Sequence, residues 1–172
     1  MSFNFNDMDQ ITPLIYLGNS SAASNISKLK ELGIKKVLSV LDQFDWPKYD
    51  ESQFNHKTLA IKDFDDQNII KHFGECLNFI KGDDKVLVHC AAGQSRSASV
   101  VIAYIMWTKK MSFKDGLEFV NQKVFFFVYP NDGFRDQLQI FEKELIEKNY
   151  DIDKIKFEEI KWEPKNYYDY DL

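Results

Sequence analysis

The sequence has little of what marks membrane-spanning, secreted or nucleic-acid-binding proteins. Among its 172 residues there are two cysteines, seven glycines and four prolines. The longest unbroken apolar run covers residues 100–107, well short of the roughly 20 residues that a membrane-spanning helix needs. The 22 basic and 27 acidic side chains give a net charge of −5, which leaves no basic excess to neutralise nucleic acid phosphates. We therefore expect neither a membrane nor a nucleic acid as the partner.

The cysteines are too few to form a disulfide framework, since only Cys76 and Cys90 are present. Residues 1–10 contain no positive charge and no apolar stretch, so they lack the pattern of a secretory signal. Both features indicate a soluble protein of a reducing compartment. We expect it in the cytoplasm, with access to the nucleus.

Arginine is scarce as well, because only Arg96 and Arg135 occur among the 22 basic side chains. In a chain that uses lysine for general positive charge, an arginine is a candidate for a task that needs the planar guanidinium group. For Arg135 we nevertheless expect an ordinary surface ion pair.

What the sequence does contain is a high share of aromatic side chains, 15%, together with alternating strand and helix patterns. A β-branched apolar run predicts a strand at residues 36–41, the period-two spacing of Leu59 and Ile61 predicts one at 56–62, and short apolar runs predict strands at 15–18 and 85–90. Helical spacing and end signals predict helices from Ser20 or Ser21 to Gly33, over residues 68–82, 97–110 and 132–148, and one that begins at Ser112. Residues 42–52 are expected to form a loop. Strands early and between helices, followed by helices alone, predict an α/β domain with a mostly parallel sheet.

One segment, residues 89–97, combines residue types that suit phosphate chemistry. It lies where a predicted strand ends and a predicted helix begins, and a helix N-terminus offers free backbone N–H groups and a positive dipole end to an anion. Its small side chains let the backbone curl around that anion. The residues expected to form this phosphate loop are Ala91, Ala92, Gly93, Gln94 and Ser95.

Cys90 and Arg96 stand at the two ends of the phosphate loop. The field of the helix N-terminus should favour the thiolate form of Cys90, which is a nucleophile. The guanidinium of Arg96 can bind two oxygens of one phosphate, which a lysine cannot do. A buried cysteine beside an arginine that merely caps a neighbour is the alternative. The strand, loop and helix around these residues favour a phosphate-monoester site.

The string His-Cys-Ala-Ala-Gly-Gln-Ser-Arg-Ser at residues 89–97 resembles the signature loop of the cysteine-dependent protein phosphatases, in its dual-specificity form. The resemblance extends from about residue 11 to residue 146, and includes Ile-Tyr-Leu-Gly-Asn at 15–19 and Pro-Asn-Asp-Gly-Phe at 130–134. It implies a twisted, mostly parallel five-stranded sheet flanked by helices. We expect a catalytic domain over residues 1–149 and an extension over 150–172, which is either packed, or a partner-docking segment, or disordered.

The same resemblance implies a two-step hydrolysis that needs no metal and no other cofactor. Cys90 would attack phosphorus while Asp63 protonates the leaving oxygen, since an unprotonated alkoxide leaves slowly. Asp65 and Asp66 remain alternatives for this acid. Arg96 and the backbone of the phosphate loop would hold the phosphate oxygens.

Supporting roles are implied for three further residues. Ser97 would hydrogen-bond the departing sulfur, and His89 would order the loop. Asn131 either braces the phosphate loop from the adjacent turn or simply begins a helix. Cys76 lies among apolar residues and is expected to be a packed core thiol rather than a redox partner of Cys90.

The substrate expected from this resemblance is a phosphoprotein that carries phosphotyrosine, phosphoserine or phosphothreonine. The phosphoinositide branch of the family tends to carry a lysine within this loop, and the loop of this chain has none. The alternatives are a phosphoprotein-binding module without turnover, or a phosphatase for a lipid, glucan or RNA-end phosphate.

Residues 125–127, all phenylalanine, either form an apolar wall beside the pocket or enter the core, and we expect at least two of them in the core. The sequence carries no signal for the oligomeric state.

Overall fold

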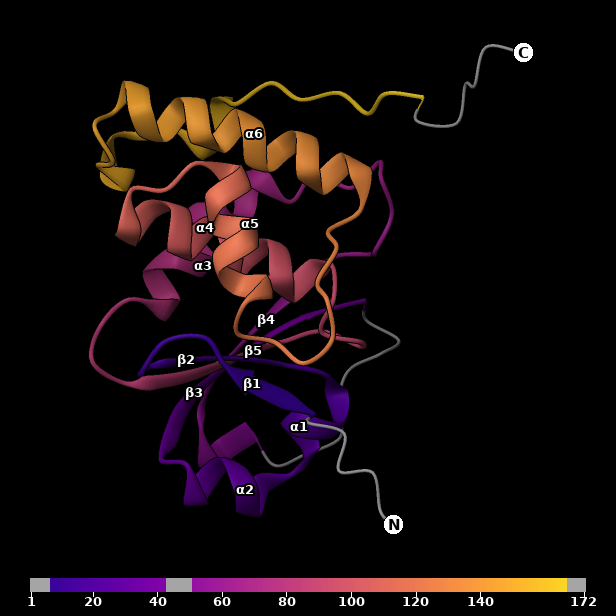
Figure 1. The fold of residues 1–172 in the computed structure, drawn as a ribbon, viewed down its shortest axis with the longest axis vertical. Helices are drawn as coiled ribbons and strands as arrows, with labels where there is room; N and C mark the ends of the chain where they lie inside the picture. Colours follow the sequence, from indigo (N-terminus) through magenta and orange to yellow (C-terminus); the bar gives the residue numbers. More distant parts are fainter. Residues whose placement is uncertain (1–6, 43–50, 167–172) are drawn as a thin grey trace.

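A five-stranded sheet forms the centre of the computed structural model, which describes residues 7–42 and 51–166 (Figure 1). The strand order is β1-β2-β5-β3-β4. The strands are β1 (Met8–Gln10), β2 (Ile15–Gly18), β3 (Ile34–Leu41), β4 (Asn55–Ala60) and β5 (Lys85–His89). β1 runs antiparallel to β2, and the other neighbouring pairs are parallel. The predicted mostly parallel five-stranded sheet is confirmed.

The edge strand β1 is the strand that the apolar pattern does not predict. It is short and consists of Met-Asp-Gln, with its residues half-buried or exposed. Backbone pairing with β2 makes it a strand, in a register that places Met8 opposite Gly18. The other four strands appear within two residues of their predicted starts and ends, and the apolar runs that mark β3 and β5 are buried along most of their length.

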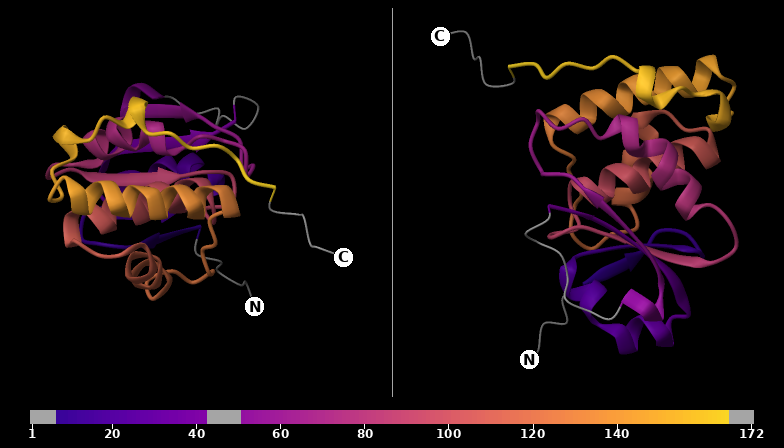
Figure 2. Two further views of the ribbon diagram at one scale, coloured as in Figure 1. Left: turned by 90° about the horizontal axis from the view of Figure 1, so that it is seen from above. Right: turned by 180° about the vertical axis from the view of Figure 1, so that it is seen from behind.

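Helices cover both faces of the sheet (Figures 1 and 2). The smaller side carries α1 (Ser20–Ser24) and α2 (Ile26–Glu31), and the larger side carries α3 (Phe73–Ile80), α4 (Arg96–Lys109), α5 (Phe113–Asn121) and α6 (Asp132–Glu147). α4 is buried along most of its length and contacts α3, α5, α6 and β5. Within residues 7–42 and 51–166, no helix is both long and apolar enough to cross a membrane.

The prediction of one helix from Ser20 or Ser21 to Gly33 is wrong in two respects. The first cap is Asn19, whose Oδ1 accepts a hydrogen bond of 3.0 Å from the Ala22 N–H. A second cap, Asn25, then interrupts the helix, and its Oδ1 accepts from the Lys28 N–H at 3.1 Å. An asparagine side chain that bonds the backbone in this way ends one helix and begins the next.

The later helices follow their predictions closely, since α4 and α6 lie within one residue of the expected ranges and α5 begins one residue after Ser112. Ser112 caps α5 by accepting from the Asp115 N–H at 3.1 Å. The helix predicted from residue 68 begins later than expected, because the 3-10 turn η2 (Ile70–His72) precedes α3. Most of the predicted loop over residues 42–52 lies outside the described residues.

The hydrophobic core continues past residue 149, the expected end of the catalytic domain. The turns η3 (Ile152–Lys154) and η4 (Phe157–Glu159) follow α6 and return along it (Figure 2). Ile152 and Ile155 are buried in the main core cluster, and the Trp107 indole N–H donates to the Tyr150 carbonyl at 3.0 Å. The first part of the extension is therefore packed against the domain.

Candidate active site

The phosphate loop connects the end of β5 at His89 to the start of α4 at Arg96. It lies at the carboxyl end of the parallel strands, where open α/β sheets bind their ligands. A turn within the loop depends on Gly93, which has a φ of +76° and whose missing Cβ would lie 2.8 Å from the Gly18 carbonyl oxygen. A side chain at this position would therefore strain the loop.

Cys90 lies at the base of this loop and is 2% exposed. Its Sγ accepts two hydrogen bonds, one of 3.2 Å from the Gly93 N–H and one of 3.1 Å from the Ser97 hydroxyl. Both donors stabilise negative charge on the sulfur. The structure thus places Ser97 against the sulfur, where the resemblance implied it.

Arg96 is buried at the first position of α4, with 6% exposure. Its Nη1 donates to the Ile61 carbonyl at 3.3 Å. Ile61 lies two residues before Asp63, so Arg96 links the phosphate loop to the segment that carries the candidate acid.

Asp63, Ser95 and Asn131 form a closed hydrogen-bonded group. The Asp63 Oδ1 accepts from the Ser95 hydroxyl at 2.6 Å and from the Asn131 side-chain amide at 2.9 Å. The Asn131 backbone N–H donates to the Ser95 Oγ at 3.0 Å. Asn131 also caps α6, since its Oδ1 accepts from the Phe134 N–H at 2.9 Å. Asn131 thus both contacts the phosphate loop and begins a helix.

The two alternative acids have other contacts. The Asp65 Oδ1 accepts from the Gly133 N–H at 3.4 Å, and the Asp66 Oδ1 accepts from the Gln67 side-chain amide at 3.0 Å. The backbone of Asp65 packs directly on Gly133, where a Cβ would collide with it. Asp65 therefore anchors the acid loop (residues 61–67) to α6, while Asp63 faces the phosphate loop.

Gln137 is a positioning residue that sequence reasoning missed. It is fully buried, and its Oε1 accepts from the backbone N–H groups of Ile69 and Ile70 at 2.8 and 3.0 Å. Its amide donates to the Gln67 carbonyl at 2.8 Å. These bonds hold the far end of the acid loop against α6. The available signal was a glutamine next to Leu138 on the apolar stripe of that helix.

His89 is fully buried and stays neutral at physiological pH. Burial lowers its pKa to about 4, and the charges of His56 and Arg96 act in the same direction, against a hydrogen bond to the Cys90 carbonyl. Its Nε2 lies 2.6 Å from the Ser39 hydroxyl, which in turn lies 2.8 Å from Nε2 of His56. This arrangement fixes the imidazole beneath the phosphate loop. Ser39 lies inside an apolar strand, where the sequence pattern gives no sign of this role.

Cys76 is also fully buried, on α3. Burial raises the pKa of its thiol to about 12, and the nearby negative charge of Glu75 contributes in the same direction. The side chain is therefore a protonated thiol packed in the core, as expected from its apolar neighbours.

Two expectations about side chains near the site are wrong. Arg135 was expected in a surface ion pair, but its guanidinium carbon lies 4.6 Å from the Tyr129 ring centroid and 5.7 Å from that of Phe113, a cation–π arrangement. At least two of the phenylalanines at 125–127 were expected in the core, but all three are exposed, by 68, 46 and 66%. Val128 occupies the buried position instead, so the preceding residues cross the surface.

Comparison with known proteins identifies the family of this chain. The family model described as "Dual specificity phosphatase, catalytic domain" matches residues 15–144. Dual specificity protein phosphatase 1-B of Xenopus laevis is 33% identical over 141 residues, which cover 80% of this chain and 37% of that protein. Dual specificity protein phosphatase 6 of Homo sapiens is 36% identical over 140 residues, covering 79% and 36%. The chain spans little more than a third of the length of these relatives.

Solved structures with the same fold include two that are informative here. The human tyrosine phosphatase-like serine/threonine/tyrosine-interacting protein has a TM-score of 0.76 at 35% identity, with 81% of this chain and 97% of that chain covered. The Yvh1 phosphatase domain from Chaetomium thermophilum has a TM-score of 0.70 at 27% identity, with 80% and 96% covered. The chain therefore belongs to the dual specificity phosphatase catalytic-domain family.

Proposed function

We propose that this chain is a protein phosphatase that hydrolyses phosphotyrosine and phosphoserine or phosphothreonine through a cysteinyl-phosphate intermediate. The observation that carries the proposal is that three groups lie at the ends of the phosphate loop or are bonded to it. These are the Cys90 sulfur with its two donors, the buried guanidinium of Arg96, and the Asp63 carboxyl bonded to Ser95. They correspond to a nucleophile, an oxygen-binding cation and a general acid.

In the first step, the Cys90 thiolate attacks phosphorus and an S–P bond forms as the P–O bond to the leaving group breaks. Asp63 gives its proton to the leaving oxygen, so that a neutral alcohol or phenol departs. Arg96 and the N–H groups of residues 91–95 hold the equatorial oxygens and stabilise the charge of the transition state.

In the second step, water attacks the phosphorus of the cysteinyl phosphate. Asp63, now a carboxylate, takes a proton from that water, and the S–P bond breaks with the electron pair returning to sulfur. The Ser97 hydroxyl, 3.1 Å from Sγ, stabilises the thiolate as it leaves. Inorganic phosphate is released and both residues return to their starting forms, with no metal or other cofactor required.

A phosphoprotein is the substrate class that the loop favours. Ala91, Ala92 and Gln94 add no positive charge beside the phosphate, whereas a polyanionic lipid headgroup would call for additional basic side chains. The mechanism also requires a reduced Cys90, so we place the protein in a reducing compartment such as the cytoplasm or nucleus.

The test is hydrolysis of p-nitrophenyl phosphate by the wild type, Cys90→Ser and Cys76→Ala, with a chelator and a reductant present. We expect turnover in the wild type and in Cys76→Ala, and none above background in Cys90→Ser. Turnover that persists in Cys90→Ser, or its absence from folded, reduced wild type, would overturn the proposal. Phosphopeptides assayed beside a phosphoinositide, a phosphoglucan and an RNA 5′-end then identify the substrate class.

A second candidate function is phosphoprotein binding without turnover, because one similar solved structure is named an interacting protein. The presence of Cys90, Arg96, Ser97 and Asp63 favours the enzyme. Binding of a phosphopeptide by a wild-type chain that does not hydrolyse it would favour the second candidate.

A further inference from the structure

The connection between α5 and α6 contains a five-residue stretch, 125–129, in which four aromatic side chains are exposed. This aromatic segment consists of Phe125, Phe126, Phe127 and Tyr129, which are 68, 46, 66 and 55% exposed. Single exposed apolar residues are ordinary, but a contiguous group marks a contact surface. In the described part of the chain, Phe64 and Ile146 are the other large hydrophobic side chains with comparable exposure.

The aromatic segment is held in place by hydrogen bonds of its backbone. The Asn121 side chain accepts from the Val128 N–H at 2.8 Å and donates to the Val128 carbonyl at 3.3 Å. The Tyr129 N–H donates to the Gln94 carbonyl at 2.9 Å, and the Phe125 N–H donates to the Asp9 carboxylate at 3.1 Å. A segment tied to both the phosphate loop and β1 presents its rings in a defined geometry, which lowers the entropy cost of binding.

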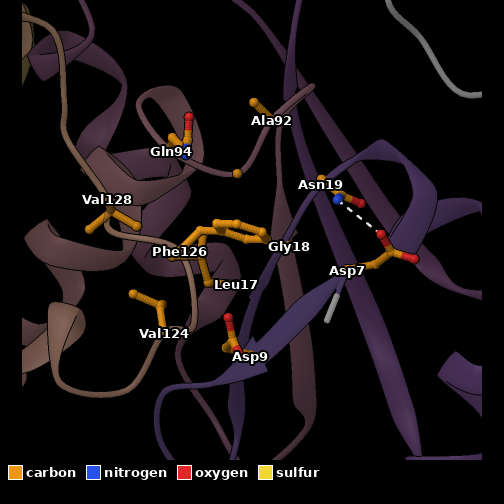
Figure 3. A pocket seen from close by; sticks show the side chains of 11 residues that line it. Asp7, Asp9, Leu17, Gly18, Asn19, Ala92, Gln94, Val124, Phe126 and Val128 are labelled. Carbon is orange, nitrogen blue, oxygen red and sulfur yellow. Dashed lines mark hydrogen bonds between the residues drawn. The ribbon is translucent and has the colours of Figure 1, made fainter. Parts of the chain in front are cut away.

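A pocket lies between the aromatic segment and the phosphate loop (Figure 3). Alternate residues of the connection, Val124, Phe126 and Val128, line it together with residues 92–94 of the phosphate loop. Because Ala92, Gly93 and Gln94 line the pocket and also belong to the phosphate loop, the pocket borders the loop that would bind the phosphate. Its volume is about 40 Å³, so a large side chain would enter it only in part and would pack mainly on the exposed rings beside it.

The lining of this pocket selects the kind of side chain it suits. Phe126 and Val124 offer apolar surface next to the buried side chains of Val128 and Leu17, while Asp7 and Asp9 contribute carboxylates at the β1 side. A large apolar side chain gains from burial against the rings. An acidic side chain would meet two negative charges and is disfavoured.

We propose that the pocket and the aromatic segment bind a large apolar side chain close to the phosphoresidue of a protein substrate. This inference rests on the proposed function, since it assumes that a phosphorylated segment occupies the phosphate loop. It makes the aromatic segment a specificity surface, through which the chain selects phosphoproteins by the residues beside the phosphate.

The experiment compares phosphotyrosine peptides that differ at one flanking position, with leucine, serine, glutamate or lysine placed at each position in turn. The measured quantity is the ratio of kcat/KM between the leucine and serine peptides within each variant, so that a general loss of activity cancels. The variants are the wild type, Phe126→Ser, the double variant Phe125→Ser with Phe127→Ser, and Ile146→Ser. The last removes an exposed apolar side chain of α6.

We expect a leucine preference of about tenfold in the wild type, consistent with partial burial of one apolar side chain. It should fall towards unity in Phe126→Ser and decrease in the double variant, while Ile146→Ser keeps it. The glutamate peptide should be the slowest. Equal rates for leucine and serine in the wild type, or a preference that survives both serine variants, would overturn the inference. So would a preference for lysine that persists in Phe126→Ser.

Binding measurements separate this inference from the proposed function. The same peptides are titrated into Cys90→Ser, which cannot turn them over, and the ratio of Kd values replaces the ratio of kcat/KM. A leucine preference in Kd together with an inactive wild type would retain the specificity surface and reject the enzyme. An active wild type without the leucine preference would retain the enzyme and reject the specificity surface.

Discussion

The Ser95 hydroxyl donates a 2.6 Å hydrogen bond to Oδ1 of Asp63 and so joins the phosphate loop to the acid loop. The two residues are separated by 32 positions in the sequence. Asn131 completes the group by bonding both of them, and Arg96 adds a second link through the Ile61 carbonyl. The position of the acid therefore depends on the same loop that binds the phosphate, which aligns proton donor and nucleophile before a substrate arrives.

Replacing Asp63 by asparagine should slow hydrolysis most for substrates with poor leaving groups. Asparagine retains the shape but has no proton to give, so kcat on phenyl phosphate should fall by about 10²–10³-fold. A fluorinated phenyl phosphate, whose leaving group departs unprotonated, should be affected much less. Steady-state kinetics on the two substrates measures the difference. Asp65→Asn and Asp66→Asn are the matched controls, and a selective loss in either one would move the acid to that residue.

Ser95→Ala should weaken catalysis by misplacing the acid while leaving the nucleophile intact. The variant loses a donor to Asp63 and an acceptor for the Asn131 N–H, and we expect kcat to fall about tenfold, as for loss of one intramolecular hydrogen bond. The loss should be greater for a poor leaving group than for a good one. Ser99→Ala, which removes a 2.8 Å bond to the Ser95 carbonyl, is the control. A uniform loss across leaving groups would contradict the positioning role.

The buried His89 should make the protein less stable as the pH falls. Because burial lowers its pKa from 6.5 to about 4, the unfolded chain binds a proton between these values that the folded chain does not. The stabilisation is complete above about pH 6.5 and declines towards pH 4. At pH 5 the loss should amount to about 2 kcal/mol of the free energy of unfolding. Urea denaturation at pH 7.5 and 5 measures it.

His89→Gln provides the comparison for that pH series. Its amide can bond Ser39 but does not titrate, so its stability should change less between the two pH values. His56 and His72 are present in both proteins. Equal pH dependence in the wild type and the variant would show that His89 is not the responsible group.

Ile152→Ala should destabilise the domain although it lies beyond the family resemblance. The side chain is 5% exposed and belongs to the main core cluster, and a buried isoleucine reduced to alanine costs about 3 kcal/mol. Ile146→Ala, at a position 60% exposed, should cost less than about 0.5 kcal/mol. Chemical denaturation of both variants measures the change in the free energy of unfolding. A similarly small change for both would mean that the extension adds nothing to the core.

Much of the site could be predicted from the sequence because its central part is contiguous. The strand that ends at His89, the small-residue loop and the apolar helix from Arg96 all leave local signals in the apolar pattern. The choice of arginine in a lysine-rich chain and the loop spacing from Cys90 pointed to phosphate chemistry. These features depend on neighbours in the chain, and the structure places them at one end of the sheet.

The contacts between segments distant in the sequence were decided only by the tertiary structure. The bonds of Ser95 to Asp63, of Gln137 to residues 67–70, and of Ser39 to His89 join parts of the chain that no periodicity relates. The exposure of residues 125–127 has the same origin, since Val128 takes the core position that was expected for the phenylalanines. Local sequence determines which residues favour a strand, a helix or an anion-binding turn. Which polar groups meet and which aromatic rings stay exposed is settled only when the packed elements compete for the same space.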